Sequence, residues 1–90
     1  MRFALITHDK PGALQIRMDT RTAHLDYIAS TGVVEMAGPF LDDAGQMCGS
    51  LIILELPDMV AAQAWAHDDP YAKAGLFATV TLSAWKKVIG

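Results

Sequence analysis

Six segments of the chain show the periodicities of regular secondary structure, and their order is the strongest constraint on the fold. Four are apolar runs or alternate between two kinds of side chain, as strands do, and two carry apolar residues at helical spacing. The expected strands cover residues 3–8, 33–37, 50–56 and 76–85, and the expected helices run from 13 to about 31 and from 58 onward. The order along the chain is therefore strand, helix, strand, strand, helix, strand.

The first expected helix has an apolar face and a clear end. Leu14, Met18, Leu25 and Ile28 recur at helical spacing and are expected to point toward the sheet. Gly32 follows the last of them, at the position where a glycine commonly forms the C-cap of a helix. These residues predict one long helix that packs through this face.

Turn and capping residues also divide the second half of the chain. Gly38-Pro39 is expected to end the second strand, and residues 42–45 have the composition of a hairpin loop. Asp58 is the expected N-cap of the second helix, and Asp69 is expected to cap a further short turn that begins with Pro70. The expected inner face of the second helix consists of Val60, Ala61, Ala64 and Trp65.

This βαββαβ order is the split βαβ, or ferredoxin-like, pattern of the α+β class. It predicts a four-stranded antiparallel sheet with two helices on one face. The third expected strand is apolar almost throughout, so we expect it to be central. The other face of the sheet stays open in a monomer although its strands are apolar, and we expect a homodimer that pairs this open face with a second copy.

The composition supports the same interpretation. The chain has 90 residues, of which 52% are hydrophobic, and shows no repeat or linker, so we expect a single domain over residues 1–90. A domain of this size buries only about 60% of the surface that its unfolded chain exposes. Part of the apolar surface is therefore expected to lie against a partner.

Charge, hydropathy and cysteine content exclude several classes of function. The net charge is -3 and the basic residues are scattered apart from Lys86-Lys87, which argues against nucleic acid as a partner. The apolar runs are too short to span a membrane, and the N-terminal residues lack the layout of a signal peptide. A single cysteine cannot form a disulfide framework. We therefore expect a cytoplasmic location.

His24 and Asp69 are the residues whose chemistry is most suggestive. His24 lies within the first expected helix, and Asp69 directly precedes Pro70. A histidine oriented by a carboxylate forms a proton-transfer pair, because imidazole changes charge near physiological pH and the acid fixes its tautomer. Taken singly, His24 also fits a helix-surface residue and Asp69 an ordinary helix cap.

The motifs around these two residues, in their order and spacing, resemble the YCII-related domain family over residues 3–87. The resemblance rests on His24-Leu25-Asp26-Tyr27-Ile28, Ala37-Gly38-Pro39, Gly49-Ser50, Ala61-Ala62-Gln63-Ala64-Trp65-Ala66, Asp69-Pro70-Tyr71 and Ala74-Gly75-Leu76-Phe77. It implies a YCII-related domain of the dimeric α+β barrel superfamily, which also contains muconolactone isomerases. It further implies that His24 and Asp69 act as a catalytic pair.

Other residues are expected to shape the site around this pair. Ser50 could hold a developing oxyanion, although a plain strand-start serine is the simpler interpretation. Gly38 and Pro39 are expected to shape the cavity. Tyr71 and Phe77 could wall it, or could be core aromatics.

Together these observations predict a small enzyme of lyase or isomerase type that acts on a small carbonyl or lactone-like substrate through His24 and Asp69. A non-catalytic module for small-ligand binding or dimerisation is the alternative, and a cofactor-free monooxygenase of the same superfamily is a third. We expect no cofactor. The spacing of His8, His24 and His67 does not match recognised metal sites.

Overall fold

The computed structural model describes all residues from 1 to 90 and contains one sheet and three helices. The elements in chain order are β1 (Arg2–Asp9), α1 (Leu14–Thr31), β2 (Val34–Leu41), β3 (Met47–Glu55), α2 (Met59–Asp68), α3 (Pro70–Lys73) and β4 (Phe77–Trp85). All neighbouring strands are antiparallel, in the order β2-β3-β1-β4. The predicted ferredoxin-like fold and the central position of β3 are confirmed.

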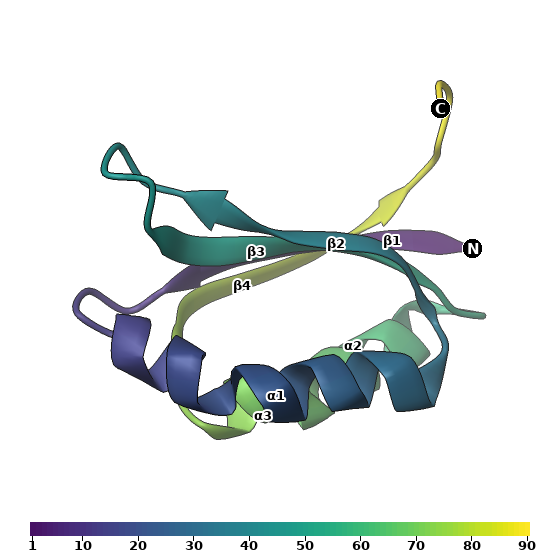
Figure 1. The fold of residues 1–90 in the computed structure, drawn as a ribbon. Helices are drawn as coiled ribbons and strands as arrows, with labels where there is room; N and C mark the ends of the chain where they lie inside the picture. The colour runs from purple at the N-terminus through teal and green to yellow at the C-terminus, as the bar shows by residue number, and fades with distance from the viewer.

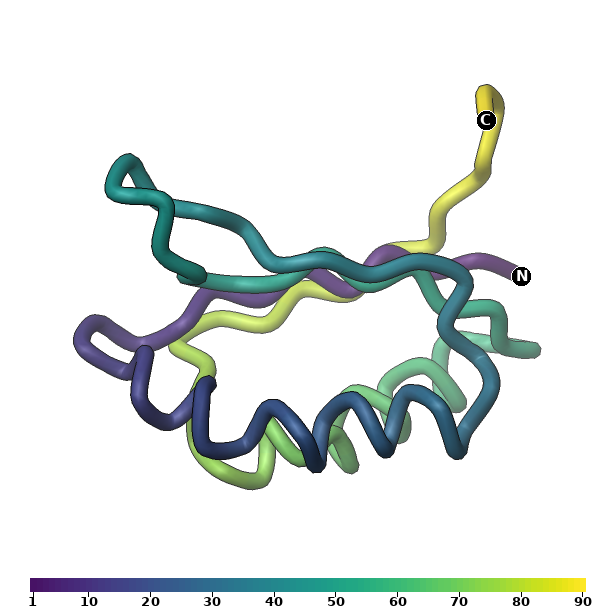
Figure 2. Tube along the Cα trace, viewed as in Figure 1, coloured from purple at the N-terminus to yellow at the C-terminus, as the bar shows by residue number.

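The helices form one layer and the sheet forms the other. α1 and α2 lie below the sheet in Figure 1, and the opposite face of the sheet carries no helix. The Cα trace in Figure 2 shows the last residues leaving the sheet on this uncovered side. The core lies between the two layers and consists of Phe3, Leu5, Ile52, Leu54, Ala62 and Trp65.

Strand β2 continues through the pair that was expected to end it. It runs to Leu41 and pairs Gly38 with Leu51 and Pro39 with Ser50 across β3. The prediction of a strand end at Gly38-Pro39 was wrong, because β2 is an edge strand. At an edge, one side of the backbone has no partner strand, so a proline without an N–H group is tolerated.

Strand β3 also begins earlier than expected, at Met47. Ser50 therefore lies inside this strand rather than at its start. Cross-strand pairing extends the strand beyond its apolar part, because β2 supplies partners as far as Leu41, which lies opposite Met47.

The buried face of α1 is polar, which the apolar pattern did not predict. Its buried residues are Arg17 and His24, whereas Met18 and Leu25 are 52% and 45% exposed. Burial of a polar side chain costs little only when it is hydrogen-bonded. Both residues have partners in other elements, as described below.

The inner face of α2 was predicted only in part. Trp65 is buried as expected, but Val60 is 74% exposed and Ala62 is the other buried residue of the helix. The small side chain of Ala62 lets the helix approach the core residues of the sheet closely. Asp58 caps the helix as predicted, since its carboxylate accepts a hydrogen bond from Ala61 N at 2.9 Å.

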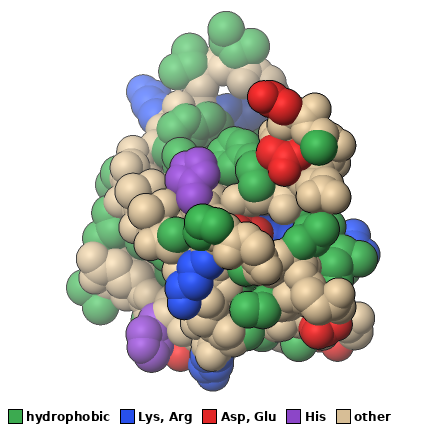
Figure 3. All heavy atoms as spheres, turned by 90° about the vertical axis from the view of Figure 1, so that its left-hand side faces the viewer, with side chains coloured by type: hydrophobic (Ala, Val, Ile, Leu, Met, Phe, Trp, Pro, Cys, Tyr) green, Lys and Arg blue, Asp and Glu red, His purple; other side chains and the backbone are tan.

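The molecular surface agrees with the mixed charge of the sequence. At the end of the molecule shown in Figure 3, basic and acidic side chains are scattered among hydrophobic ones without a basic patch. None of the three helices combines the length and the hydrophobicity that a membrane-spanning helix requires.

Candidate active site

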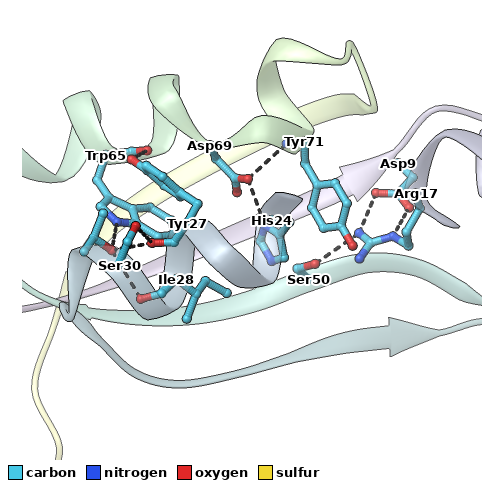
Figure 4. Close-up of polar contacts among 11 residues, drawn as sticks. Asp9, Arg17, His24, Tyr27, Ile28, Ser30, Ser50, Trp65, Asp69 and Tyr71 are labelled. Atoms are coloured by element: carbon cyan, nitrogen blue, oxygen red, sulfur yellow. Dashed lines mark hydrogen bonds and ion pairs between the residues drawn. The ribbon is translucent and has the colours of Figure 1, made fainter. Parts of the chain in front are cut away.

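The structure brings His24 of α1 and Asp69 into direct contact. His24 Nδ1 lies 2.8 Å from Asp69 Oδ1, and the side chains of His24 and Asp69 are 8% and 1% exposed. In Figure 4, the imidazole ring of His24 extends from α1 toward the carboxylate of Asp69. Two segments that are distant in sequence therefore meet in the interior.

Asp69 owes its position to the start of α3. It is the N-cap of this short helix, and its Oδ1 also accepts a hydrogen bond from Tyr71 N at 3.0 Å. Pro70 occupies the first helical position and keeps the preceding residue extended, as observed at Asp69 (φ -59, ψ 128). The capping role and the contact with His24 are thus compatible, because one oxygen serves both.

This arrangement determines how the imidazole is oriented. A carboxylate oxygen is an acceptor, so His24 donates through Nδ1–H in this contact. In the neutral ring the other nitrogen, Nε2, then carries a free lone pair. Neutral His24 in this tautomer is a hydrogen-bond acceptor and a potential base at Nε2.

A hollow of about 170 Å³ lies beside His24, between α1 and strands β2 and β3. Its polar and charged lining residues come from α1, β3 and α3, and its other lining residues are apolar. It is lined by Arg17, Arg21, His24, Leu25, Ile28, Ala37, Gly38, Pro39, Met47, Ser50, Ile52 and Tyr71. Among the residues that the sequence singled out, Gly38, Pro39, Ser50 and Tyr71 therefore line it together with His24.

Phe77 does not line the hollow. It contacts the Tyr71 ring edge-on, with ring centroids 6.1 Å apart. Tyr71 in turn stacks on His24, with centroids 3.9 Å apart and an interplanar angle of 17°. Phe77 thus packs behind Tyr71, which matches the alternative interpretation of Phe77 as a core aromatic.

Arg17 is a prominent residue of the site that sequence reasoning missed. It is 2% exposed and holds Asp9 through Nε and Nη2 at 2.7 and 2.9 Å. Its Nη2 also donates to Ser50 Oγ at 3.0 Å, and its Cζ lies 4.7 Å from the centroid of the Tyr71 ring. This side chain therefore links β1, α1, β3 and α3.

One signal for Arg17 was present in the sequence. It precedes His24 by seven residues, which is about two helical turns and places both on one face of α1. The partner Asp9 follows the first apolar strand directly. Only the fold, however, shows that this face points inward.

Charge and burial shift the titration of two groups in this region. Burial alone lowers the pKa of Arg17, but hydrogen bonding and charge attraction from Asp9 outweigh it and hold that pKa above its ordinary value. Burial raises the pKa of Tyr71 above 10.0 although Arg17 and Arg21 act in the opposite direction. At neutral pH the site therefore contains a charged guanidinium and a protonated phenol.

The chain is thus a ferredoxin-like α+β domain in which a small hollow lies beside a buried histidine–aspartate pair. The sequence profile of the YCII-related domain family matches residues 1–86. Protein YciI of Escherichia coli is 35% identical over 98% of this chain and 99% of its own length. An uncharacterized protein of Haemophilus influenzae is 31% identical over the same shares. The chain belongs to the YCII-related domain family.

Solved structures extend this comparison. The 5-chloro-2-hydroxyhydroquinone dehydrochlorinase TftG of Burkholderia phenoliruptrix, in complex with 2,5-dihydroxybenzoquinone, is 35% identical and superposes with a TM-score of 0.87. The match covers 96% of this chain and 94% of TftG. An antibiotic biosynthesis monooxygenase is 14% identical with a TM-score of 0.60 over 98% of both chains, a likeness that concerns the fold alone.

Proposed function

We propose that the chain is a small lyase or isomerase that uses His24, oriented by Asp69, to move a proton on a small carbonyl or lactone-like substrate. The observation that carries the proposal is the 2.8 Å contact between His24 Nδ1 and a buried carboxylate, at the wall of a hollow. The similarity to TftG supports an enzyme, because TftG is a dehydrochlorinase and its complex holds a small cyclic dicarbonyl compound.

The proposed chemistry begins with the free lone pair of His24. Nε2 removes a proton from a carbon next to a carbonyl group, and the electrons of the broken C–H bond form an enolate. In an elimination, the enolate electrons then expel a leaving group such as chloride with its bonding pair. In an isomerisation, the imidazolium returns the proton to a different carbon. Asp69 remains a carboxylate throughout and stabilises the imidazolium.

The enolate oxygen requires hydrogen-bond donors, and two hydroxyl groups are suitably placed. Ser50 Oγ accepts a hydrogen bond from Arg17 Nη2, which leaves its own O–H free to donate into the hollow. Tyr71 also lines the hollow, and its raised pKa keeps the phenol protonated as a donor. Donors fixed in this way stabilise charge that develops only during the reaction.

The test is turnover of a panel of small lactones, halogenated carbonyl compounds and chlorinated hydroxyhydroquinones. Chloride release reports elimination. Uptake of solvent deuterium, followed by NMR, reports proton transfer separately. We expect turnover by the wild-type protein and a loss of about 10²–10⁴-fold in His24→Ala, the range for removal of a general base. Asp69→Asn is expected to lower the rate as well, because the imidazolium loses its counter-charge.

The chain contains a matched control pair. His67 and Asp68 also approach each other, with Nδ1 and Oδ1 3.3 Å apart, but their side chains are 86% and 59% exposed. His67→Gln and Asp68→Asn should leave turnover unchanged. If the whole panel shows neither exchange nor turnover although ligands bind in the hollow, the chain is a non-catalytic binding module instead.

We further propose that the chain is a cytoplasmic homodimer that pairs the open faces of two sheets. Large apolar side chains are exposed on this face, including Leu51, whose neighbours Ser50 and Ile52 are buried on the helix side. Met36 and Trp85 are likewise 49% and 39% exposed. The single cysteine supports a reducing compartment.

A further inference from the structure

The hollow beside His24 has a positive lining in a chain that is acidic overall. Arg17 and Arg21 both line it, and none of its lining residues is Asp or Glu. The net charge of the whole chain is -3. The positive charge of the lining is therefore a local feature, and it does not reflect an excess of basic residues in the whole chain.

The two arginines differ in what their charges already contact. Arg17 is buried and paired with Asp9, whose side chain is 6% exposed, so most of its charge is compensated within the fold. Arg21 is exposed and has no ion pair with any carboxylate of the chain. Arg21 is thus the one uncompensated cation in the lining.

Arg21 is also placed to reach a ligand that contacts His24. It precedes His24 by three residues on α1, so the two side chains leave the same helix face with their Cβ atoms about 5–6 Å apart. The charge of Arg21 acts on the phenol of Tyr71, the aromatic ring that stacks on His24. Cation, base and aromatic wall therefore surround one small space.

The remaining lining limits the ligand in size and character. The space measures about 170 Å³, and an apolar cavity of roughly 150 Å³ accommodates benzene. Leu25, Ile28, Pro39, Met47 and Ile52 contribute apolar surface. A carbon skeleton of about one six-membered ring fits this description.

We propose that the hollow selects a small, ring-sized monoanion whose negatively charged oxygen pairs with Arg21 while its carbon skeleton lies against the apolar lining and His24. The charged group is a carboxylate or an ionised hydroxyl. The inference deepens the proposed function, because it names the substrate class of the same site, and it assigns Arg21 to substrate binding. One uncompensated cation favours one negative charge on the ligand.

Benzoate and benzamide are suitable probes, because they have nearly the same shape and differ in charge. Each is titrated into the 15N-labelled protein, and dissociation constants come from the NMR shifts of residues that line the hollow. We expect the wild-type protein to bind benzoate about fivefold or more tightly than benzamide, as for one partly exposed ion pair. Arg21→Gln is expected to remove this preference, and Arg21→Lys to retain part of it.

Two further variants separate this proposal from its alternatives. Lys86→Gln removes a positive charge just after the end of β4, outside the hollow, and should keep the preference. His24→Gln should also keep it, because binding of the anion does not require the base. Failure of the proposed proton transfer would thus leave the binding result intact.

Three results would overturn the proposal. The first is equal affinity of wild-type protein for the two probes, and the second is no saturable shift in the hollow with benzoate. The third is a preference that survives in Arg21→Gln, in particular one that is lost in His24→Gln, since the anion would then pair with the imidazolium.

Discussion

At the scale of single residues, Tyr71 connects the two polar groups of the site. Its ring lies between His24 and Arg17, stacked on the first at 3.9 Å and 4.7 Å from Cζ of the second (Figure 4). Its backbone N–H donates to Asp69. A residue that the sequence presented equally well as a core aromatic therefore fixes the orientation of the proposed base and of its carboxylate.

The burial of the Tyr27 phenol can be tested through the pH dependence of stability. Burial, followed by the charges of Asp68 and Asp69, raises its pKa from 10.0 to about 12. The unfolded chain loses this proton near the ordinary value, so the unfolded state is favoured as pH rises. We expect stability to be intact below pH 10 and to fall between 10 and 12, as urea denaturation at each pH would show.

The tyrosinate absorbance of the folded protein checks the same shift directly. Both tyrosines have raised pKa values, so neither should ionise at the ordinary value of 10.0. Asp68→Asn should lower the pKa of Tyr27, because it removes one of the two negative charges. Ordinary titration of both phenols in the folded protein would contradict the burial described here.

At the scale of elements, α1 carries much of the site on one face. Arg17, Arg21 and His24 are spaced at four and three residues along it, and all three line the hollow. The helix therefore uses polar contacts, in place of an apolar stripe, to hold part of its inner face against the sheet. This explains why its apolar periodicity was a poor guide to its buried residues.

The Arg17–Asp9 pair should contribute strongly to stability. Arg17→Met leaves the buried carboxylate of Asp9 without a counter-charge, and we expect a loss of about 3–5 kcal/mol in the free energy of unfolding. The matched variant Arg21→Met removes an exposed charge without an ion pair, and should change it by less than about 0.5 kcal/mol. Urea denaturation measures both.

The double variant Asp9→Asn/Arg17→Met provides the control for this interpretation. It removes both charges, so part of the loss should be recovered because no buried charge stays unpaired. Equal losses in the single and double variants would show that packing around Arg17, and not its charge, supports the contact between β1 and α1.

Strand pairing can be tested at two glycines. A Cβ at Gly49 of β3 would collide with the backbone oxygen of Thr7 and lie 3.2 Å from Phe40 Cδ2, whereas one at Gly38 of β2 meets no atom within 4 Å. Gly49→Ala is expected to cost about 1–3 kcal/mol, the usual range for overpacking. Gly38→Ala should stay within about 0.5 kcal/mol in the same denaturation experiment. Equal stability of the two variants would contradict the register between β1 and β3.

At the scale of the whole molecule, the two faces of the sheet differ. One face contacts the helices and holds the core and the hollow, and the other is uncovered (Figure 1). A chain of 90 residues has a small core, so the apolar side chains left exposed on the uncovered face are a substantial share of the apolar surface that it could bury. This asymmetry is the physical basis for the proposed homodimer.

Sedimentation of two lysine variants tests the dimer. Leu51 lies on the uncovered face and is 37% exposed, whereas Val60 lies on α2 and is 74% exposed. Leu51→Lys places a charge in the proposed interface and should yield monomers, and Val60→Lys should remain dimeric like the wild type. A monomeric wild-type protein, or a dimeric Leu51→Lys variant, would exclude pairing through this face.

Much of the fold could be predicted from local pattern. The strands and helices follow from side-chain periodicity, and Asp58, Asp69 and Gly32 mark helix ends through capping chemistry that depends on near neighbours only. The end of β2 could not be predicted in this way. Whether Pro39 interrupts a strand depends on whether that strand lies at an edge, which is a property of the assembled sheet.

Local sequence pattern is therefore enough to predict the βαββαβ order, the helix caps and the two residues with matching chemistry, His24 and Asp69. Which face of α1 is buried, and with it the presence of Arg17 and Arg21 in the hollow, depends on contacts between distant segments of the chain. The physical reason is that a polar side chain is buried only where a partner satisfies it. Those partners, Asp9 and Asp69, come from other segments of the chain.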